Sequence, residues 1–397
     1  MNKKASISLL ITILILLCSI IIPMTFTKKE TVSSTLNVYT SSSDESDTDE
    51  MKGLWVSFIS LDMTGTDRKY ETFKSKFNEI IEKAKEYKYN TLIVQIRPFS
   101  DALYNSDYYP WSHILSGTQG VSPGYNALEY MCNASHKENL KLHAWINPYR
   151  IKTAQTPEIL SEDNIYKTNP DICIETNSGI YLNPAKEKSR ELIIEGVKEI
   201  VSKYDVDGIQ FDDYFYPPDI TDEDHEDYNT YKKSTSDFIN TENWRKANVN
   251  ILIAEVYKTI KAVNKNIVFG ISPQGNIQNN NEISADIESW CKYIGYADYI
   301  CPQLYFSIDN PALRFEECLR QWSELSYHNS IKVYIGLGAY KAGTDADNGT
   351  WQNRNDILAT ELELLRKYSF DGFIIYDYNA LLSESAQAEL KNLKSII

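Results

Sequence analysis

The amino-acid sequence predicts an α/β protein, a (β/α)8 TIM barrel preceded by an N-terminal transmembrane or signal segment. Three observations predict the barrel. Eight short runs rich in β-branched and aromatic residues are spaced along residues 51–397. Segments with helical apolar periodicity separate these runs. The glycine-rich first turn that is usual in a doubly wound sheet is missing, so a closed barrel is favoured over that fold.

The predicted strands cover residues 53–59, 91–96, 142–146, 208–211, 267–271, 299–304, 332–336 and 372–376. Between the first two, one helical stripe is formed by Phe73, Phe77, Ile80, Ile81, Ala84 and Tyr87. Similar stripes precede the fourth strand and follow the sixth. The longest insertions are expected after strands two, three and four. In such barrels the loops that follow the strands build the functional site, so function is sought in what ends each strand.

The N-terminal region divides into two segments. Residues 1–29 hold an uncharged stretch from Ile7 to Phe26 after Lys3 and Lys4, about the length that spans a bilayer, so we expect a signal anchor or a signal peptide. No Ala-x-Ala pattern follows, which favours the anchor. The protein is then held in the cell membrane and faces the extracellular side, or is secreted if the segment is cleaved. Residues 30–50, rich in Ser, Thr and acidic residues, are expected to be a disordered linker to the barrel at 51–397.

Charge and cysteine content restrict the partners. The 397-residue chain has a formal net charge of −15 and lacks the basic clusters that bind phosphate backbones, so a nucleic-acid partner is not expected. Neutral glycans stay plausible as ligands. Five of the six cysteines lie outside the apolar segment, without the paired spacing of a disulfide framework or a zinc site. We expect a monomer.

The run from Asp207 to Pro217 is the most informative part of the chain. Side chains alternate along a strand, so Gly208, Gln210 and Asp212 share one face while the apolar residues between them pack on the other. Asp212 therefore ends the fourth strand. A carboxylate aimed into a barrel mouth is costly unless it is paired or used, which favours a functional role for Asp212.

The other strand ends are polar and aromatic as well. The candidates are Gln95, Arg97 and Asp101 after strand two, Trp145, Asn147 and Tyr149 after strand three, Tyr214 after strand four, Gln303 and Tyr305 after strand six, and Asp377 after strand eight. Aromatic rings stack on the C–H faces of sugars, while amides and acids bind the hydroxyl groups. Each aromatic residue has an alternative role as a core lid, and Arg97 as a structural ion-pair partner. His143 and Asp207 are assigned structural roles.

Eight ordered blocks resemble the glycosyl hydrolase-like 10 family of bacterial envelope proteins. They read GLWV at 53–56, QIRP at 95–98, DALY at 101–104, PWS at 110–112, HAWINPYR at 143–150, DGIQFDDYFYP at 207–217, SPQG at 272–275 and PQLY at 302–305. The resemblance covers residues 51 to 380. It implies a TIM-barrel glycoside hydrolase, and it suggests a polysaccharide substrate, the glycan strands of peptidoglycan.

The fourth-strand block is also similar to that of α-amylase-type glycosidases, where the last Asp is the nucleophile. This similarity gives Asp212 the role of nucleophile or base. Two departures limit it: Gln210 replaces the usual Arg, and residues 272–274 lack the strand-five Glu that would be the acid. Glycoside hydrolysis needs a second carboxyl group, and Asp101 and Asp213 rank above Asp377 as the acid. The acid must hold its proton near neutral pH.

Two other classes of function compete with hydrolysis. A non-catalytic glycan-binding barrel on the cell surface is favoured by the missing strand-five Glu. Metal-dependent deacetylation or phosphodiester cleavage, with Asp212 and Asp213 around a divalent ion, is disfavoured because the histidine ligands usual in deacetylases are lacking. The preferred hydrolytic scheme uses no metal and no cofactor. Gln95 and Arg97 would orient substrate or acid, and Trp145, Tyr149, Tyr214 and Tyr305 would stack on sugar rings.

Overall fold

The computed structural model describes residues 50–217 and 219–397. The predicted signal segment at 1–29 and all but the last residue of the predicted linker lie outside these described residues. Within the described part of the chain, no helix is long and apolar enough to cross a membrane.

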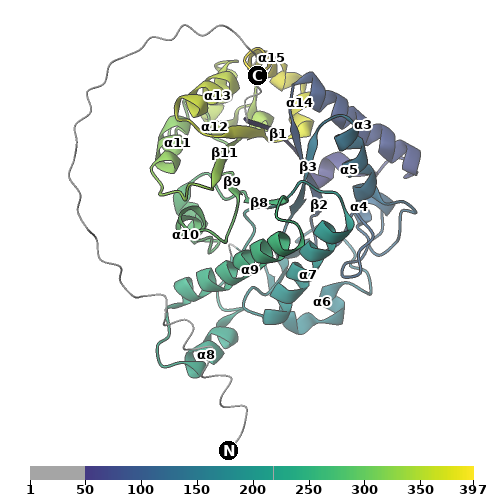
Figure 1. The fold of residues 1–397 in the computed structure, drawn as a ribbon, viewed down its shortest axis with the longest axis vertical. Coiled ribbons are helices and arrows are strands. Elements are labelled where there is room, and N and C mark those ends of the chain that lie inside the picture. The colour runs from purple at the N-terminus through teal and green to yellow at the C-terminus, as the bar shows by residue number, and fades with distance from the viewer. Residues whose placement is uncertain (1–49, 218) are drawn as a thin grey trace, which may run out of the picture. The chain divides into compact units, whose positions relative to one another are not determined.

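A closed parallel barrel forms the centre of this part of the chain and confirms the predicted fold (Figure 1). Its strands are β1 (Met51–Val56), β2 (Thr91–Arg97), β3 (Lys141–Ile146), β7 (Gly208–Phe211), β8 (Val268–Ile271), β9 (Tyr299–Ile300) with β10 (Gln303–Leu304), β11 (Lys332–Leu337) and β12 (Gly372–Ile375). Each strand pairs with its neighbour in chain order, and β12 returns to β1. The β9–β11 pairing closes the barrel.

Two strands differ from the sequence-based prediction. The first strand ends at Val56 rather than at residue 59, because Phe58–Leu61 turns into the short helix α2. The sixth strand is split into β9 and β10 on either side of Cys301 and Pro302. Pro302 has no N–H to give to a ladder, so the split follows from the backbone chemistry of proline.

Helices surround the barrel (Figure 1). The longer ones are α3 (Tyr70–Glu86), α5 (Ala127–Lys137), α7 (Glu187–Lys203), α9 (Thr241–Val263), α11 (Phe315–Ser323) and α13 (Ile357–Lys367), and shorter ones are α10 (Ile287–Lys292), α12 (Ala346–Gly349), α14 (Tyr378–Leu382) and α15 (Gln387–Lys394). The predicted stripe on α3 is buried at Phe73, Phe77, Ile80, Ile81 and Ala84. Its apolar face therefore packs inward, as the periodicity requires.

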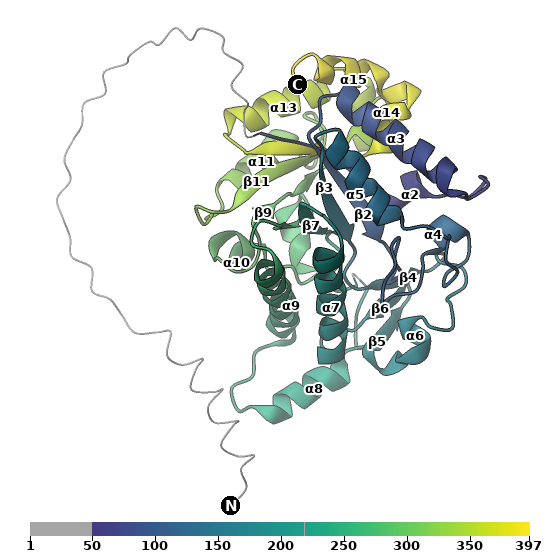
Figure 2. The same cartoon turned by 45° about the vertical axis from the view of Figure 1, so that its right-hand side comes forward.

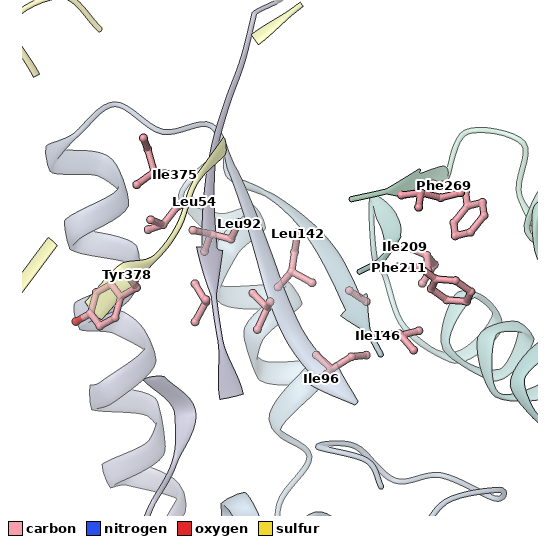
Figure 3. Close-up of a cluster of buried hydrophobic side chains, with 14 of the residues drawn as sticks. Leu54, Leu92, Ile96, Leu142, Ile146, Ile209, Phe211, Phe269, Ile375 and Tyr378 are labelled. Carbon is pink, nitrogen blue, oxygen red and sulfur yellow. The ribbon is translucent and has the colours of Figure 1, made fainter. Parts of the chain in front are cut away.

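The strands bury two layers of side chains. Outward-facing residues pack beneath the helices, and Figure 3 shows this layer at Leu54, Leu92, Leu142, Ile209 and Phe269. Their sequence neighbours face the barrel axis, where Trp55, Ile93, Trp145, Tyr299, Cys301 and Ile374 form a second cluster. Burying one such large side chain contributes about 1.5–3 kcal/mol. The period of two thus fixes which residues reach the barrel interior.

The longest insertions follow β2, β3 and β7, as predicted. The first contains α4 (His113–Ser116) and the third α8 (His225–Ser234). The second holds a three-stranded antiparallel sheet of β4 (Arg150–Thr153), β6 (Gly179–Leu182) and β5 (Cys173–Thr176), together with α6 (Ile165–Thr168). Figure 2 shows this sheet beside α6, in the part of the molecule that also holds α4.

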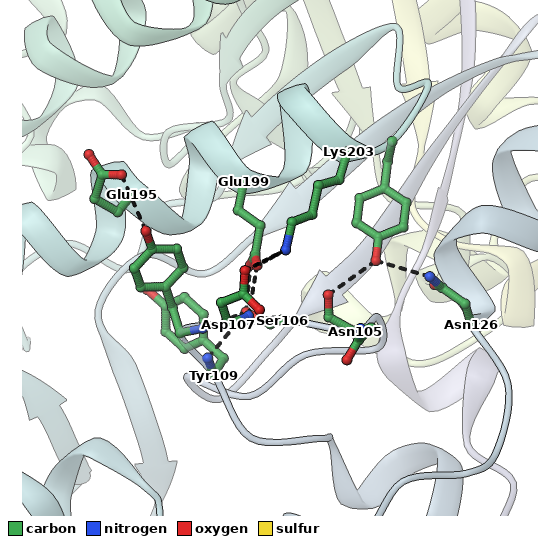
Figure 4. A network of polar contacts seen from close by, with 10 residues as sticks. Asn105, Ser106, Asp107, Tyr109, Asn126, Glu195, Glu199 and Lys203 are labelled. Atoms are coloured by element: carbon green, nitrogen blue, oxygen red, sulfur yellow. Dashed lines mark hydrogen bonds and ion pairs between the residues drawn. The ribbon is translucent and has the colours of Figure 1, made fainter.

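A polar network anchors the loop after β2 to α7 (Figure 4). The buried Glu199 carboxylate accepts from Ser106 Oγ at 2.5 Å and from the Asp107 backbone N–H at 2.7 Å. Lys203 Nζ bridges Glu199 and Asp107 at 2.8 and 2.6 Å. Tyr204 donates to the Asn105 carbonyl at 3.2 Å. A buried carboxylate that is paired in this way fixes the loop, because releasing it would leave its charge uncompensated.

Tight packing inside the barrel gives a testable consequence. A Cβ atom at Gly270 would lie 1.9 Å from Tyr299 Cζ, so the change Gly270→Ala overpacks the interior and should lower the free energy of unfolding by about 3 kcal/mol. Urea denaturation measures this change. The double variant Gly270→Ala/Tyr299→Ala is the control, since removing the ring removes the clash. If the double variant lost as much free energy of unfolding as the two single variants together, the clash would not be the cause of the destabilisation.

Candidate active site

A cavity of about 440 Å³ opens at the carboxyl ends of the barrel strands. Its lining comes from nearly every strand end and is polar and aromatic. The lining residues are Trp55, Ser57, Phe58, Ile59, Gln95, Trp145, Arg150, Gln210, Asp212, Asp213, Tyr214, Ser272, Gln303, Tyr305, Tyr340 and Tyr376. Seven of the candidates predicted from the sequence line this cavity together: Gln95, Trp145, Asp212, Asp213, Tyr214, Gln303 and Tyr305. The loops that follow the strands therefore build the pocket, as expected for this fold.

Asp212 directly follows β7 and is 4% exposed. Trp145 Nε1 donates to its Oδ2 at 2.9 Å, and Asn147 Nδ2 donates to the same oxygen at 3.3 Å. Burial raises the pKa of Asp212 to about 7, the positive charge of Arg150 opposes that rise, and the neighbouring Asp213 adds to it. The carboxyl group is therefore poised to exchange a proton near neutral pH.

Asp213 lines the same cavity, so the chain has already turned out of the strand at this residue. Gln303 Nε2 donates to Asp213 Oδ1 at 3.0 Å and to the Ser272 carbonyl at 2.9 Å. Burial raises the pKa of Asp213, and the Gln303 hydrogen bond opposes the rise. The charge of half-buried Asp213 also raises the pKa of buried Asp212, so ionisation of both groups at once is disfavoured.

An aromatic wall of Trp55, Tyr305, Tyr340 and Tyr376 lines the cavity, with side chains from four different strand ends. The Tyr305 ring lies 5.4 Å from the Tyr376 ring and 5.8 Å from the Tyr340 ring, centroid to centroid. Tyr340 is 46% exposed, so its ring is accessible at the cavity mouth. Such a wall presents the flat apolar surfaces on which sugar rings stack.

Two buried amides hold the first strand at the cavity. Gln210 Oε1 accepts from Trp55 Nε1 at 2.6 Å, and Gln95 Oε1 accepts from the Phe58 backbone N–H at 3.2 Å. Gln210 stands where the amylase-type motif has Arg, and here its side chain supports the aromatic wall. Gln95 is one of the predicted ligands and does line the cavity.

Five other predicted residues lie outside the cavity lining, and Asp101, Tyr149 and Asn147 are three of them. Asp101 is fully buried, and its Oδ2 accepts from Gln119 Nε2 at 3.0 Å. Tyr149 is 0% exposed in the core, where no sugar can stack on it. Asn147 lies behind the lining and contacts it through Asp212. The catalytic role of Asp101 and the stacking role of Tyr149 thus gain no support from this geometry and stay sequence-based predictions.

Arg97 points away from the cavity because of an irregularity in β2. The register between β2 and β3 shifts at Gln95 and Arg97, as at a β-bulge. Strict alternation would place both side chains on the inner face, but the bulge turns Arg97 outward. Its guanidinium lies 4.3 Å from the Tyr109 ring centroid and is 1% exposed. A role in orienting substrate is not supported there.

Asp377 lies next to the cavity lining. Ser57 Oγ, which does line the cavity, donates to Asp377 Oδ2 at 3.0 Å. Burial raises the pKa of Asp377, and the Ser57 hydrogen bond opposes the rise. Its carboxyl group therefore acts on the cavity through Ser57, which ranks it below Asp213 as the second acid.

Arg150 is a site residue that the sequence reasoning did not select. It lines the cavity, and its guanidinium lies 4.7 Å from the Tyr214 ring centroid and 5.0 Å from that of Phe99. The one available signal was its position at the end of the HAWINPYR block. Tyr340 was missed too, because it lies in a loop with no motif.

Within residues 50–217 and 219–397, no group of three His, Cys, Asp or Glu side chains is placed to hold a metal ion. The carboxyl groups that line the cavity are those of Asp212 and Asp213. Whether the chemistry uses a metal is a question for chelator experiments, and the metal-free scheme stays a prediction.

The barrel and its acid-bearing aromatic cavity define the class of protein as a glycoside hydrolase-like barrel. The sequence profile of the glycosyl hydrolase-like 10 family matches residues 50–353, so the chain belongs to this family. It is 33% identical over 343 residues to a Bacillus subtilis (strain 168) protein named glycosyl hydrolase YngK, covering 80% of this chain and 67% of that protein. It is 33% identical over 280 residues to the Escherichia coli (strain K12) protein named glycosyl hydrolase DigH, covering 64% of this chain and 63% of that protein.

Solved structures share the fold. The glycoside hydrolase domain of PgaB from Bordetella bronchiseptica matches with a TM-score of 0.55 at 13% identity, covering 87% of this chain and 98% of that one. An α-L-fucosidase from Paenibacillus thiaminolyticus also matches with a TM-score of 0.55 at 12% identity, covering 87% of this chain and 49% of that one. At these identities the likeness shows the barrel fold alone.

The raised pKa of Asp212 has a consequence for stability. The folded protein binds a proton at Asp212 up to a pH of about 7, whereas the unfolded chain releases it near pH 3.8, so the free energy of unfolding falls as pH rises between these values. Asp212→Asn removes this penalty. We expect it to stabilise the protein at pH 8 by up to about 4 kcal/mol and to leave stability near pH 3 unchanged.

Thermal unfolding of parent and variant at the two pH values measures this difference. Asp219→Asn is a suitable control, since Asp219 lies near the protein surface and its pKa is lowered by the Ser178 hydroxyl and backbone despite some burial. An Asp212→Asn variant that is less stable than the parent at pH 8 would contradict a raised pKa.

Proposed function

We propose that the protein is a glycoside hydrolase that acts on a cell-envelope glycan, the glycan strands of peptidoglycan, by a two-carboxylate mechanism. The observation that carries the proposal is the placement of Asp212 and Asp213 in one cavity beside an aromatic wall. Glycosidic bond cleavage needs a proton donor and a second carboxylate that acts as nucleophile or base. Both groups are available here at the end of a single strand.

The hydrogen bonds of the pair support different roles for the two acids. Asp212 accepts two N–H donors on one oxygen, from Trp145 and Asn147, and these donors stabilise its ionised form. We assign it the role of nucleophile or base. Asp213 accepts from Gln303 Nε2 instead, and we assign it the role of acid. With a pKa near 7, Asp212 is ionised in part of the molecules at neutral pH, which is the form that a nucleophile or base requires. Burial raises the pKa of Asp213, which suits an acid that must hold a proton.

The substrate part of the proposal rests on the lining of the cavity and on the relatives. Trp145, Tyr214, Tyr305 and Tyr340 provide rings for stacking, and Gln95 and Gln303 provide amides for hydroxyl groups. The relatives in B. subtilis and E. coli are named glycosyl hydrolases. A membrane anchor or signal segment at residues 1–29 would place the barrel outside the cell, where envelope glycans lie.

A non-catalytic glycan-binding barrel is the second candidate. It is favoured by the cavity wall at strand five, where Ser272 stands and no Glu side chain is present among the lining residues. Such a protein needs the stacking rings but not the charge of Asp212. Turnover therefore separates the two candidates, since binding alone does not.

The first experiment compares the 51–397 fragment with its Asp212→Asn and Asp213→Asn variants on purified peptidoglycan, with and without stem peptides. We expect the parent to release reducing-end sugars and each variant to lose at least about 1,000-fold in kcat, because each removes one of two required groups. Both variants should still pull down the glycan. Activity that survives in chelator would support the metal-free scheme.

The variant Asp101→Asn is the matched control, because Asp101 is an equally buried carboxylate outside the cavity lining. It should retain turnover within about tenfold of the parent. Loss of turnover in Asp101→Asn with full activity in Asp213→Asn would move the acid role to Asp101. Glycan binding by all proteins without any turnover would replace the hydrolase by the binding barrel.

Chemical rescue tests the division of roles. In a retaining mechanism, azide replaces a missing nucleophile in Asp212→Gly and gives a glycosyl azide of inverted anomeric configuration. In Asp213→Gly, azide instead attacks the glycosyl-enzyme and gives a product of retained configuration. Proton NMR of the anomeric centre distinguishes the products. The reverse pattern would exchange the two roles.

A further inference from the structure

Among the lining residues, Arg150 supplies the one guanidinium, and its backbone and side chain are both held by neighbouring residues. Its backbone N–H donates to Asn147 Oδ1 at 3.0 Å, and its carbonyl accepts from Ser100 Oγ at 3.2 Å. Its Nε donates to the Pro98 carbonyl at 3.2 Å. The guanidinium carbon lies 5.0 Å from the Phe99 ring centroid and 4.7 Å from the Tyr214 ring centroid. The side chain is therefore preorganised, and little conformational entropy is lost when it binds a ligand.

The donors of this guanidinium are largely unused. Among the described residues, Arg150 forms no ion pair with any carboxylate, although Asp212 and Asp213 line the same cavity. Its polar neighbours are the Pro98 carbonyl and the Tyr214 hydroxyl. A guanidinium has five N–H donors, and because Arg150 lines the cavity, donors beyond these two contacts are available to a ligand there. If Arg150 served only to neutralise the acids, a direct contact with one of them would be expected.

A fixed planar guanidinium with free donors is suited to bind a carboxylate in bidentate fashion. The surrounding cavity strengthens this preference, because its other charged groups are acids and would repel an anion placed anywhere else. Neutral hydroxyl groups can be bound by amides, which the cavity also provides through Gln95 and Gln303. The positive charge of Arg150 is needed only if the ligand carries a negative one.

We propose that Arg150 recognises a carboxylate on the substrate, so that the preferred substrate is a glycan with an acidic substituent on a sugar next to the scissile bond. This inference rests on the proposed hydrolase function and names the substrate class of the same cavity. Asn147 contributes by position, because its amide oxygen holds the Arg150 backbone while its amide nitrogen holds Asp212. The distance between the anion site and the reacting carboxyl group is set in this way.

The test uses peptide-free peptidoglycan glycan strands, whose lactyl carboxylates are free, and the same strands after chemical reduction of those carboxylates to alcohols. The parent 51–397 fragment should cleave the carboxylate strands with a kcat/KM at least roughly 30-fold higher than the reduced strands. Arg150→Gln should lose this preference, so that the kcat/KM values of the variant on the two kinds of strand differ by less than about threefold. Arg150→Lys should keep part of the preference, because lysine keeps the positive charge but lacks the planar pair of donors that binds a carboxylate in bidentate fashion.

The control variant is Arg190→Gln. Arg190 likewise donates to a proline carbonyl, from Nη1 to Pro184 at 2.9 Å, but lies on α7 and does not line the cavity. It should keep the full preference for the carboxylate strands. Equal cleavage of both strands by the parent, or an equal loss on both strands in Arg150→Gln, would overturn the inference.

A binding measurement separates failure of this inference from failure of the hydrolase proposal. Calorimetry with N-acetylmuramic acid and with its carboxyl-reduced form needs no turnover. If no strand is cleaved but the parent binds the acid form more tightly and Arg150→Gln does not, the hydrolase proposal fails and carboxylate recognition stands. If the parent binds both forms equally, carboxylate recognition fails whatever the turnover.

Discussion

Closure of the parallel barrel is the constraint on which the cavity depends. The short strand β9 pairs with β8 on one side and with β11 on the other, and these pairings complete the ring of strands. Because all strands run in the same direction, their carboxyl ends meet at one rim. Trp55, Trp145, Asp212 and Tyr376 come from strand ends spread over more than 300 residues of sequence, and yet they line one cavity. No local segment of the chain could assemble this set.

The cost of placing buried Asp212 beside half-buried Asp213 shapes the surroundings of the cavity. A buried carboxylate without partners is destabilised by several kcal/mol, and here the Trp145 indole, the Asn147 amide and the Gln303 amide each donate to one. These donors only partly offset the cost, since the pKa of Asp212 still stands near 7. The fold thus tolerates a strained electrostatic arrangement at one point of an otherwise well-packed barrel, which is typical of functional sites.

The sequence predicted what depends on periodicity and failed where tertiary contacts decide. Alternation placed Gln210 and Asp212 on the inner face correctly. It does not give the direction of the Arg97 side chain, because the irregularity in β2 is a feature of strand pairing that leaves no trace in composition. Tyr149 follows a strand, as a rim residue should, but the insertion after β3 folds back and buries it. Arg150 was missed because its direction is set by Phe99 and Tyr214, which lie far from it in sequence.

The chemistry of the cavity favours catalysis over binding alone. Asparagine has nearly the same shape as aspartate and could accept the same Trp145 hydrogen bond without the desolvation cost of a charge. A protein that only held sugars would therefore lose little with amides at both 212 and 213, and would gain stability at neutral pH. What an amide cannot do is donate a proton or attack an anomeric carbon. Two carboxyl groups that are kept in the cavity at a cost to stability match the proposed hydrolase function, which requires an acid and a nucleophile or base, whereas sugar binding requires neither.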